Sequence, residues 1–99
     1  MAGPIYKLGL FKPTEAWHQL SKEEQDRVMA AETERSKQAG VKPIISCNCY
    51  WSGEQWMVFG VEEYPDIETV QRVAQLQLDA NWERYAQGIT VLGTKWEEA

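Results

Sequence analysis

The sequence predicts an α+β fold built on a four-stranded antiparallel sheet with helices on one face. Three observations support it: four short segments rich in strand formers, two longer segments with helix start signals, and the order strand, helix, strand, strand, helix, strand. No Pro-, Gly- or Ser-rich linker divides the 99 residues. Residues 1–99 are therefore expected to form a single domain.

The first strand is expected at residues 5–11, which read Ile-Tyr-Lys-Leu-Gly-Leu-Phe. Pro13 and Thr14 follow and end this strand. Thr14 can cap a brief helical turn that carries Trp17 and His18.

A longer helix is expected to begin at Ser21, because Ser21 and Glu24 have the spacing of a capping box. Gly40 is suited to the position just after its C-terminus. The apolar face of this helix is thin and Ala-rich, so the helix is expected to cover one layer only.

The second and third strands are expected at residues 41–51 and 54–64, joined by a turn at Ser52-Gly53. Pro65 ends the third strand.

The favoured register of this hairpin pairs Asn48 with Val58 and Tyr50 with Trp56 across a three-residue loop. A slip of one residue would turn the third strand over and place Glu62 under the helices without a partner.

Asp66 can cap the second long helix. Its apolar stripe consists of Ile67, Val70, Val73, Ala74, Leu78, Trp82 and Tyr85. Gly88 is expected to close this helix, and residues 89–96 to form the last strand. The order is the split βαβ, or ferredoxin-like, arrangement, with the strands in the spatial order 4-1-3-2.

Alternation along the strands divides the sheet into two faces. The favoured assignment places an almost wholly apolar set under the helices: Tyr6, Leu8, Leu10, Ile45, Cys47, Cys49, Met57, Phe59, Val61, Ile89 and Val91. The open face then carries Lys7, Gly9, Phe11, Ile44, Ser46, Asn48, Tyr50, Trp56, Val58, Gly60, Glu62, Thr90, Leu92, Thr94 and Trp96.

An open face with Phe11, Trp56 and Trp96 would be an apolar patch too large for a typical monomer. The expected cover is the same face of a second copy, related by a twofold axis. The space between two such sheets, lined by aromatic rings, hydroxyls and amides, has the composition of a small-molecule pocket.

Three segments carry a family resemblance: Lys-Pro-Thr-Glu-Ala-Trp at 12–17, Leu-Ser-Lys-Glu-Glu at 20–24 and Glu-Tyr-Pro-Asp-Ile-Glu-Thr-Val at 63–70. Together with the element order, they resemble an uncharacterised bacterial branch of the dimeric α/β-barrel superfamily. The resemblance implies sheet-to-sheet pairing into a dimeric α/β barrel. The superfamily includes cofactor-free quinone-forming monooxygenases, lactone isomerases, polyketide cyclases, haem-degrading enzymes and sensory ligand-binding domains.

The favoured function is therefore cofactor-free oxygenation, isomerisation or cyclisation of an aromatic or polyketide-like substrate in a cavity between sheets. A non-catalytic ligand-binding or dimerisation domain is the alternative. Haem binding is a third possibility, but the haem-degrading members place a catalytic His on the second helix, where this chain has Asn81 and Trp82.

The candidate catalytic residues are His18 and Tyr50. His18, the one histidine, would move a proton, while Tyr50 with Asn48 and Ser46 would donate hydrogen bonds to a developing oxyanion. The substrate ring would contact Phe11, Trp56, Thr94 and Trp96. The structural alternatives are an exposed His18 on a short helical turn and a polar ladder that bonds to the second copy.

Lys7 and Glu62 are expected side by side near the ends of their strands, either as an acid–base pair or as an ion pair at the barrel rim. Cys47 and Cys49 lack the further ligands that a zinc site requires, so small buried thiols are favoured and no metal is expected. The glycines are isolated and form no phosphate loop, so no nucleotide cofactor is expected.

The composition excludes several partners. Fifteen acidic residues against ten scattered basic ones, a net charge of −5, argue against nucleic acid. No apolar run is long enough to span a membrane, and the first residues do not resemble a signal peptide. A cytoplasmic location with reduced cysteines is expected.

Overall fold

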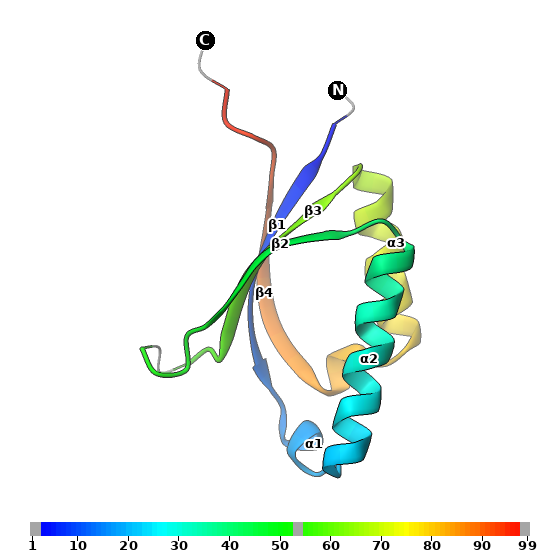
Figure 1. Cartoon of the computed structure of the whole chain (residues 1–99), viewed down its shortest axis with the longest axis vertical. Helices are drawn as coiled ribbons and strands as arrows, with labels where there is room; N and C mark the ends of the chain where they lie inside the picture. Colours follow the sequence, from blue (N-terminus) through cyan, green and yellow to red (C-terminus); the bar gives the residue numbers. More distant parts are fainter. Residues whose placement is uncertain (1–2, 53–54, 98–99) are drawn as a thin grey trace.

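The computed structural model describes residues 3–52 and 55–97 of the chain. The elements in order are β1 (Ile5–Pro13), α1 (Glu15–His18), α2 (Lys22–Gln38), β2 (Lys42–Asn48), β3 (Val58–Tyr64), α3 (Ile67–Asp79), the 3₁₀ turn η1 (Trp82–Arg84) and β4 (Ala86–Gly93). The four strands form one antiparallel sheet in the order β2-β3-β1-β4, and α2 and α3 lie together on one side of it (Figure 1). This is the predicted ferredoxin-like α+β arrangement, with the predicted strand order.

The strand register agrees with the sequence prediction. Lys7 lies opposite Glu62 in β1 and β3, and Asn48 lies opposite Val58 in β2 and β3. Both strands of the hairpin are shorter than predicted, so Tyr50 and Trp56 lie in the connection rather than in the ladder. The predicted turn at Ser52-Gly53 extends into residues outside the described part of the chain.

The helix start signals also act as predicted. Ser21 accepts from the Glu24 N–H at 3.1 Å while the Glu24 carboxylate accepts from the Ser21 N–H at 2.9 Å, which completes the capping box. Thr14 caps α1, and Asp66 caps α3 by accepting from the Thr69 N–H at 2.7 Å.

The second long helix ends earlier than predicted. Asn81 takes a left-handed conformation with φ of 56°, which few residues other than Gly and Asn adopt readily, and α3 stops at Asp79. Gly88 therefore does not close the helix but pairs with Phe11 inside the sheet. A Cβ at Gly88 would lie 2.6 Å from the Phe11 ring, so the absence of a side chain lets that ring lie against β4.

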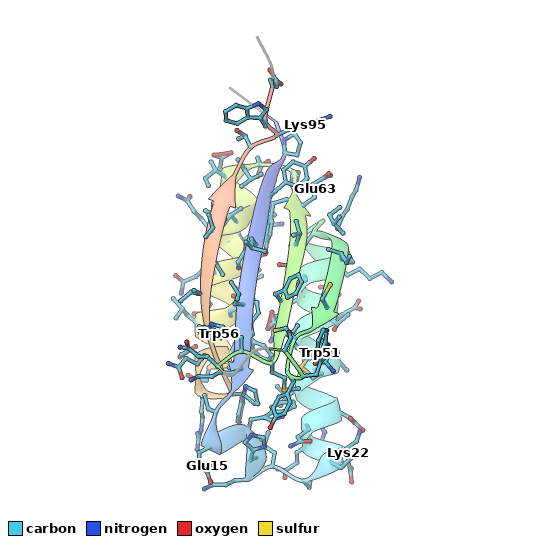
Figure 2. All side chains as sticks on the ribbon, turned by 90° about the vertical axis from the view of Figure 1, so that its left-hand side faces the viewer. Glu15, Lys22, Trp51, Trp56, Glu63 and Lys95 are labelled. Atoms are coloured by element: carbon cyan, nitrogen blue, oxygen red, sulfur yellow. The ribbon has the colours of Figure 1, made fainter. Side chains whose placement is uncertain are left out.

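The predicted assignment of the two sheet faces is wrong. The side chains that face α2 and α3 belong to the mixed set with Lys7, Gly9 and Phe11, which share a cavity with residues of both helices. The apolar set predicted to lie under the helices lies on the open face, where five of its members are exposed: Leu8, Ile45, Met57, Ile89 and Val91. Figure 2 looks onto this open face, with the helices behind the sheet.

The reason for the inversion is that little of the helix–sheet interface is a dry core. The buried hydrophobic cluster consists of Tyr64, Val73 and Val41, with Ile5, Ala39 and Val70 packed against it. It lies at the end of the sheet where β1 begins and β3 ends, because Ile5 pairs with Tyr64 there. Beyond this cluster the helices present polar side chains to the sheet, so an apolar strand face is not required beneath them.

Candidate functional site

A cavity of about 570 Å³ separates the middle of the sheet from the two long helices. We call it the helix–sheet cavity. The sheet contributes Lys7, Gly9, Phe11, Pro43, Ser46, Val58, Gly60 and Glu62, and the helices and the end of α2 contribute Met29, Glu32, Thr33, Ser36, Lys37, Val41 and Gln77. Gly9 and Gly60 face each other across β1 and β3, so two central positions of its floor carry no side chain.

One wall of the helix–sheet cavity is a buried hydrogen-bond network. Glu32 on α2 is only 8% exposed. Its two carboxylate oxygens accept from Gln77 Nε2 on α3 and from Arg35 Nη2, both at 2.8 Å. The network satisfies the buried carboxylate and ties the two helices together at the cavity.

The opposite wall holds a second polar group, made by Tyr64, Glu62 and Lys7. The Tyr64 hydroxyl donates to Glu62 Oε1 at 3.1 Å. Burial, and then the adjacent Glu62 charge, hold the pKa of Tyr64 well above its ordinary value of 10.0, so Tyr64 stays protonated and keeps donating. Lys7 Nζ lies 5.7 Å from the centre of the Tyr64 ring, and the ion pairs within the described residues do not include Lys7 with Glu62.

A second cavity, of about 510 Å³, lies where β1 leaves the sheet towards α1 and beside the β2–β3 connection. We call it the end pocket. Its described lining is Lys12, Pro13, His18, Tyr50, Gln55, Trp56 and Met57. The structure therefore brings together both candidate catalytic residues, His18 and Tyr50, with one of the candidate binding residues, Trp56.

Local hydrogen bonds hold the backbone at the two candidate catalytic residues, both of which are exposed. The turn that carries His18 is held by Thr14, which accepts from the Trp17 N–H and donates to the Arg84 carbonyl. Asn48 Oδ1 accepts from the Tyr50 N–H at 2.9 Å and so fixes the backbone where the chain leaves β2. The Asn48 side chain thereby holds the backbone of Tyr50 in place.

The other candidate binding residues do not join this pocket. Phe11 and Ser46 line the helix–sheet cavity instead. Thr94 and Trp96 follow the end of β4, and Trp96 is 86% exposed. They lie at the end of the molecule opposite Trp56, where the neighbouring Lys95 is seen in Figure 2. Seven of the eight predicted residues therefore fall into three places, and the eighth, Asn48, lines neither cavity.

Sequence reasoning missed the helix side of the larger cavity. Met29, Glu32, Thr33 and Ser36 follow the i, i+3, i+4, i+7 spacing of one helix face. A polar stripe of this kind, opposite a strand face with a central glycine, is the signal that predicts a cavity there rather than a core.

Metal ligands do not cluster in the described residues: no group of three His, Cys, Asp or Glu side chains could hold a metal ion. Cys47 and Cys49 are free and half-buried, and the Cys49 thiol donates to the Trp56 carbonyl at 3.5 Å. No helix among the described residues is long and apolar enough to cross a membrane.

The described residues thus form a small α+β fold, with a cavity between helices and sheet and a pocket at one end. No protein-family model matches the sequence, and comparison with curated proteins gives no match.

Proposed function

We propose that this chain binds a small organic molecule in the helix–sheet cavity. The observation that carries the proposal is the cavity itself: about 570 Å³ lined by one chain and partly open to solvent, in the range of known ligand sites of roughly 300–1,000 Å³. Phe11, Met29 and Val58 offer apolar contact, while Glu32, Gln77 and Lys7 offer polar groups at its sides. This mixture suits a ligand with an apolar body and a few polar substituents.

The proposed ligand site can be tested with 1-naphthol, a neutral bicyclic aromatic, followed by the NMR signals of the Met29 methyl group and the Phe11 ring. Ser36→Phe places a ring in the cavity from α2, and we expect it to weaken binding about tenfold or more. Ala30→Phe adds the same ring at an exposed position of α2 outside the lining, and it should leave the affinity within about twofold.

Failure of wild-type protein to shift the Met29 and Phe11 signals would reject the proposed site. Equal binding by Ser36→Phe and wild type would reject it as well.

We also propose that the chain works as a homodimer through the open face of the sheet. The supporting observation is the exposed apolar surface of Leu8, Ile45, Met57, Ile89 and Val91, which lies on β1, β2 and β4 and, at Met57, just before β3. Contiguous apolar patches of more than a few hundred Å² are uncommon on monomers. A second copy related by a twofold axis offers the same apolar surface. This is the pairing that the resemblance to the dimeric α/β barrels implies, with a different set of residues in the interface.

A second candidate function is cofactor-free oxygenation, isomerisation or cyclisation at the end pocket. The observation that favours it is that His18 and Tyr50, from α1 and the β2–β3 connection, line one pocket. His18 would take a proton from carbon and Tyr50 would donate to the enolate oxygen.

A β-keto ester in heavy water tests this second function, because proton abstraction appears as deuterium exchange measured by NMR. His18→Gln is expected to lower an enzyme-dependent exchange rate by about 100-fold or more, and Tyr50→Phe by about tenfold or more. This function would be rejected for that substrate class if wild type does not accelerate exchange. It would also be rejected if both variants exchange as fast as wild type.

A further inference from the structure

We propose that the end pocket is a second ligand site, selective for a planar organic anion of the aromatic carboxylate class. The proposal goes beyond the neutral ligand of the helix–sheet cavity and beyond the proton transfer considered above. It depends on three features of the pocket: its charge, its unused donors and its aromatic wall.

The described lining of the end pocket is positively charged. It contains one lysine, Lys12, and no acidic side chain, in a sequence with fifteen acidic and ten basic residues. A lysine ammonium beside neutral side chains favours an anion over a neutral molecule of the same shape.

The donors of the pocket are not used within the described part of the chain. Hydrogen bonds between described residues do not engage the side-chain polar atoms of Lys12, His18, Tyr50, Gln55 or Trp56. The Lys12 ammonium, the Tyr50 hydroxyl and the Gln55 amide can each donate to a carboxylate.

The walls of the pocket favour an organic anion over an inorganic one. Lys12 Nζ lies 5.6 Å from the centre of the Trp56 ring, so a charged group held by Lys12 would lie beside an aromatic surface. Pro13 and Met57 add apolar surface, and about 510 Å³ is far larger than an inorganic anion needs. A planar ring on or beside Trp56 with its carboxylate towards Lys12 fits this arrangement.

The experiment compares 2-naphthoate with 2-naphthamide, which keeps the ring system and removes the charge. Binding is followed by calorimetry and by the indole N–H signal of Trp56. We expect naphthoate to bind about tenfold or more tightly than naphthamide, because hydrogen bonds to a charged group are the stronger ones. Lys12→Met should reduce this ratio to about threefold or less while naphthamide affinity changes little.

Lys95→Met is the matched control, because Lys95 is exposed at the opposite end of the molecule (Figure 2), and it should preserve the full ratio. Tyr50→Phe, which removes an exposed hydroxyl donor of the pocket, is a second variant that should also lower the ratio if Lys12→Met fails to fold. Ser36→Phe should leave naphthoate binding unchanged, which separates this site from the helix–sheet cavity.

Equal affinity of wild type for the two compounds would overturn the proposal. So would absence of binding, an unchanged ratio in both Lys12→Met and Tyr50→Phe, or shifts at Met29 and Phe11 in place of Trp56.

Discussion

Tyr64 links the small core to the helix–sheet cavity. Its ring is 1% exposed and packs with Val73 and Val41, while its hydroxyl donates to Glu62, which lines the cavity. One residue thus contributes apolar burial at the end of the sheet and fixes a carboxylate at the cavity wall.

Because the pKa of Tyr64 is raised in the folded protein, the free energy of unfolding falls at alkaline pH. The folded chain keeps the Tyr64 proton above pH 10.0, where the unfolded chain loses it, so this contribution is complete below pH 10.0 and is lost as the pH rises further. Urea unfolding across this range should show a steeper alkaline loss for wild type than for Tyr64→Phe. Below pH 10.0, Tyr64→Phe should cost only about 1 kcal/mol, the loss of one hydrogen bond. Parallel curves for the two proteins would contradict this role.

At the scale of single elements, the stabilisation of α3 by its N-cap residue Asp66 depends on pH. Its carboxylate accepts from the Thr69 hydroxyl and then from the Thr69 N–H, and these hydrogen bonds lower its pKa. The contribution is therefore present above the unfolded pKa of about 3.9 and is lost as the pH falls through the folded value. Asn caps helices as well as Asp but does not titrate. Thermal unfolding should show wild type more stable than Asp66→Asn at neutral pH and equal to it in acid; an offset independent of pH would contradict this.

The pairing of β2 with β3 depends on Gly60. A Cβ at Gly60 would lie 2.9 Å from the Ile45 carbonyl oxygen, which is backbone and cannot rotate away. Gly60→Ala should therefore push the strands apart and cost about 1–3 kcal/mol in urea unfolding. Gly93→Ala is the control, because nothing lies within 4 Å of that position. Similar stability losses for the two variants would show that strand spacing at Gly60 is unimportant.

The elements that sequence predicted well depend on neighbours in the chain. The capping box of Ser21 and Glu24 and the Asp66 cap each involve residues three positions apart, so local physics decides them. The facing of the strands is different, because alternation separates two faces without saying which one the helices cover. Placing the more apolar face under the helices assumes that the helices enclose the core. That assumption fails where Glu32 and Gln77 place a polar network above the sheet.

Part of the candidate site is predictable from the sequence, because strand order and register place some of its residues. Tyr50 and Trp56 are predicted side by side at one end of the sheet, and they share the end pocket with His18, because strand order and hairpin register fix their neighbourhood. Ser46 does not line the end pocket, because it lines the helix–sheet cavity. Trp96 lies beyond the last paired residue of β4. Strand ends depend on the whole sheet, and single-strand patterns do not define them.

At the scale of the whole molecule, the helix–sheet cavity differs from the predicted one. The sequence predicts a pocket between the sheets of two copies. The protein instead keeps its dry core at one end of the sheet and leaves a cavity within a single chain. The apolar strand residues that a larger core would have used are on the open face, which is where we propose that the second copy binds.

The two faces of the sheet thus have different proposed roles, a ligand cavity on one and a dimer interface on the other. Sedimentation equilibrium of wild type, Val91→Lys and Thr90→Lys tests this division most directly. Val91 is 60% exposed on the open face, and Thr90 is its exposed neighbour in β4 on the face that carries Gly9. We expect wild type and Thr90→Lys to be dimers at micromolar concentration and Val91→Lys to be a folded monomer. A monomeric wild type, or a Val91→Lys protein as dimeric as wild type, would contradict the account.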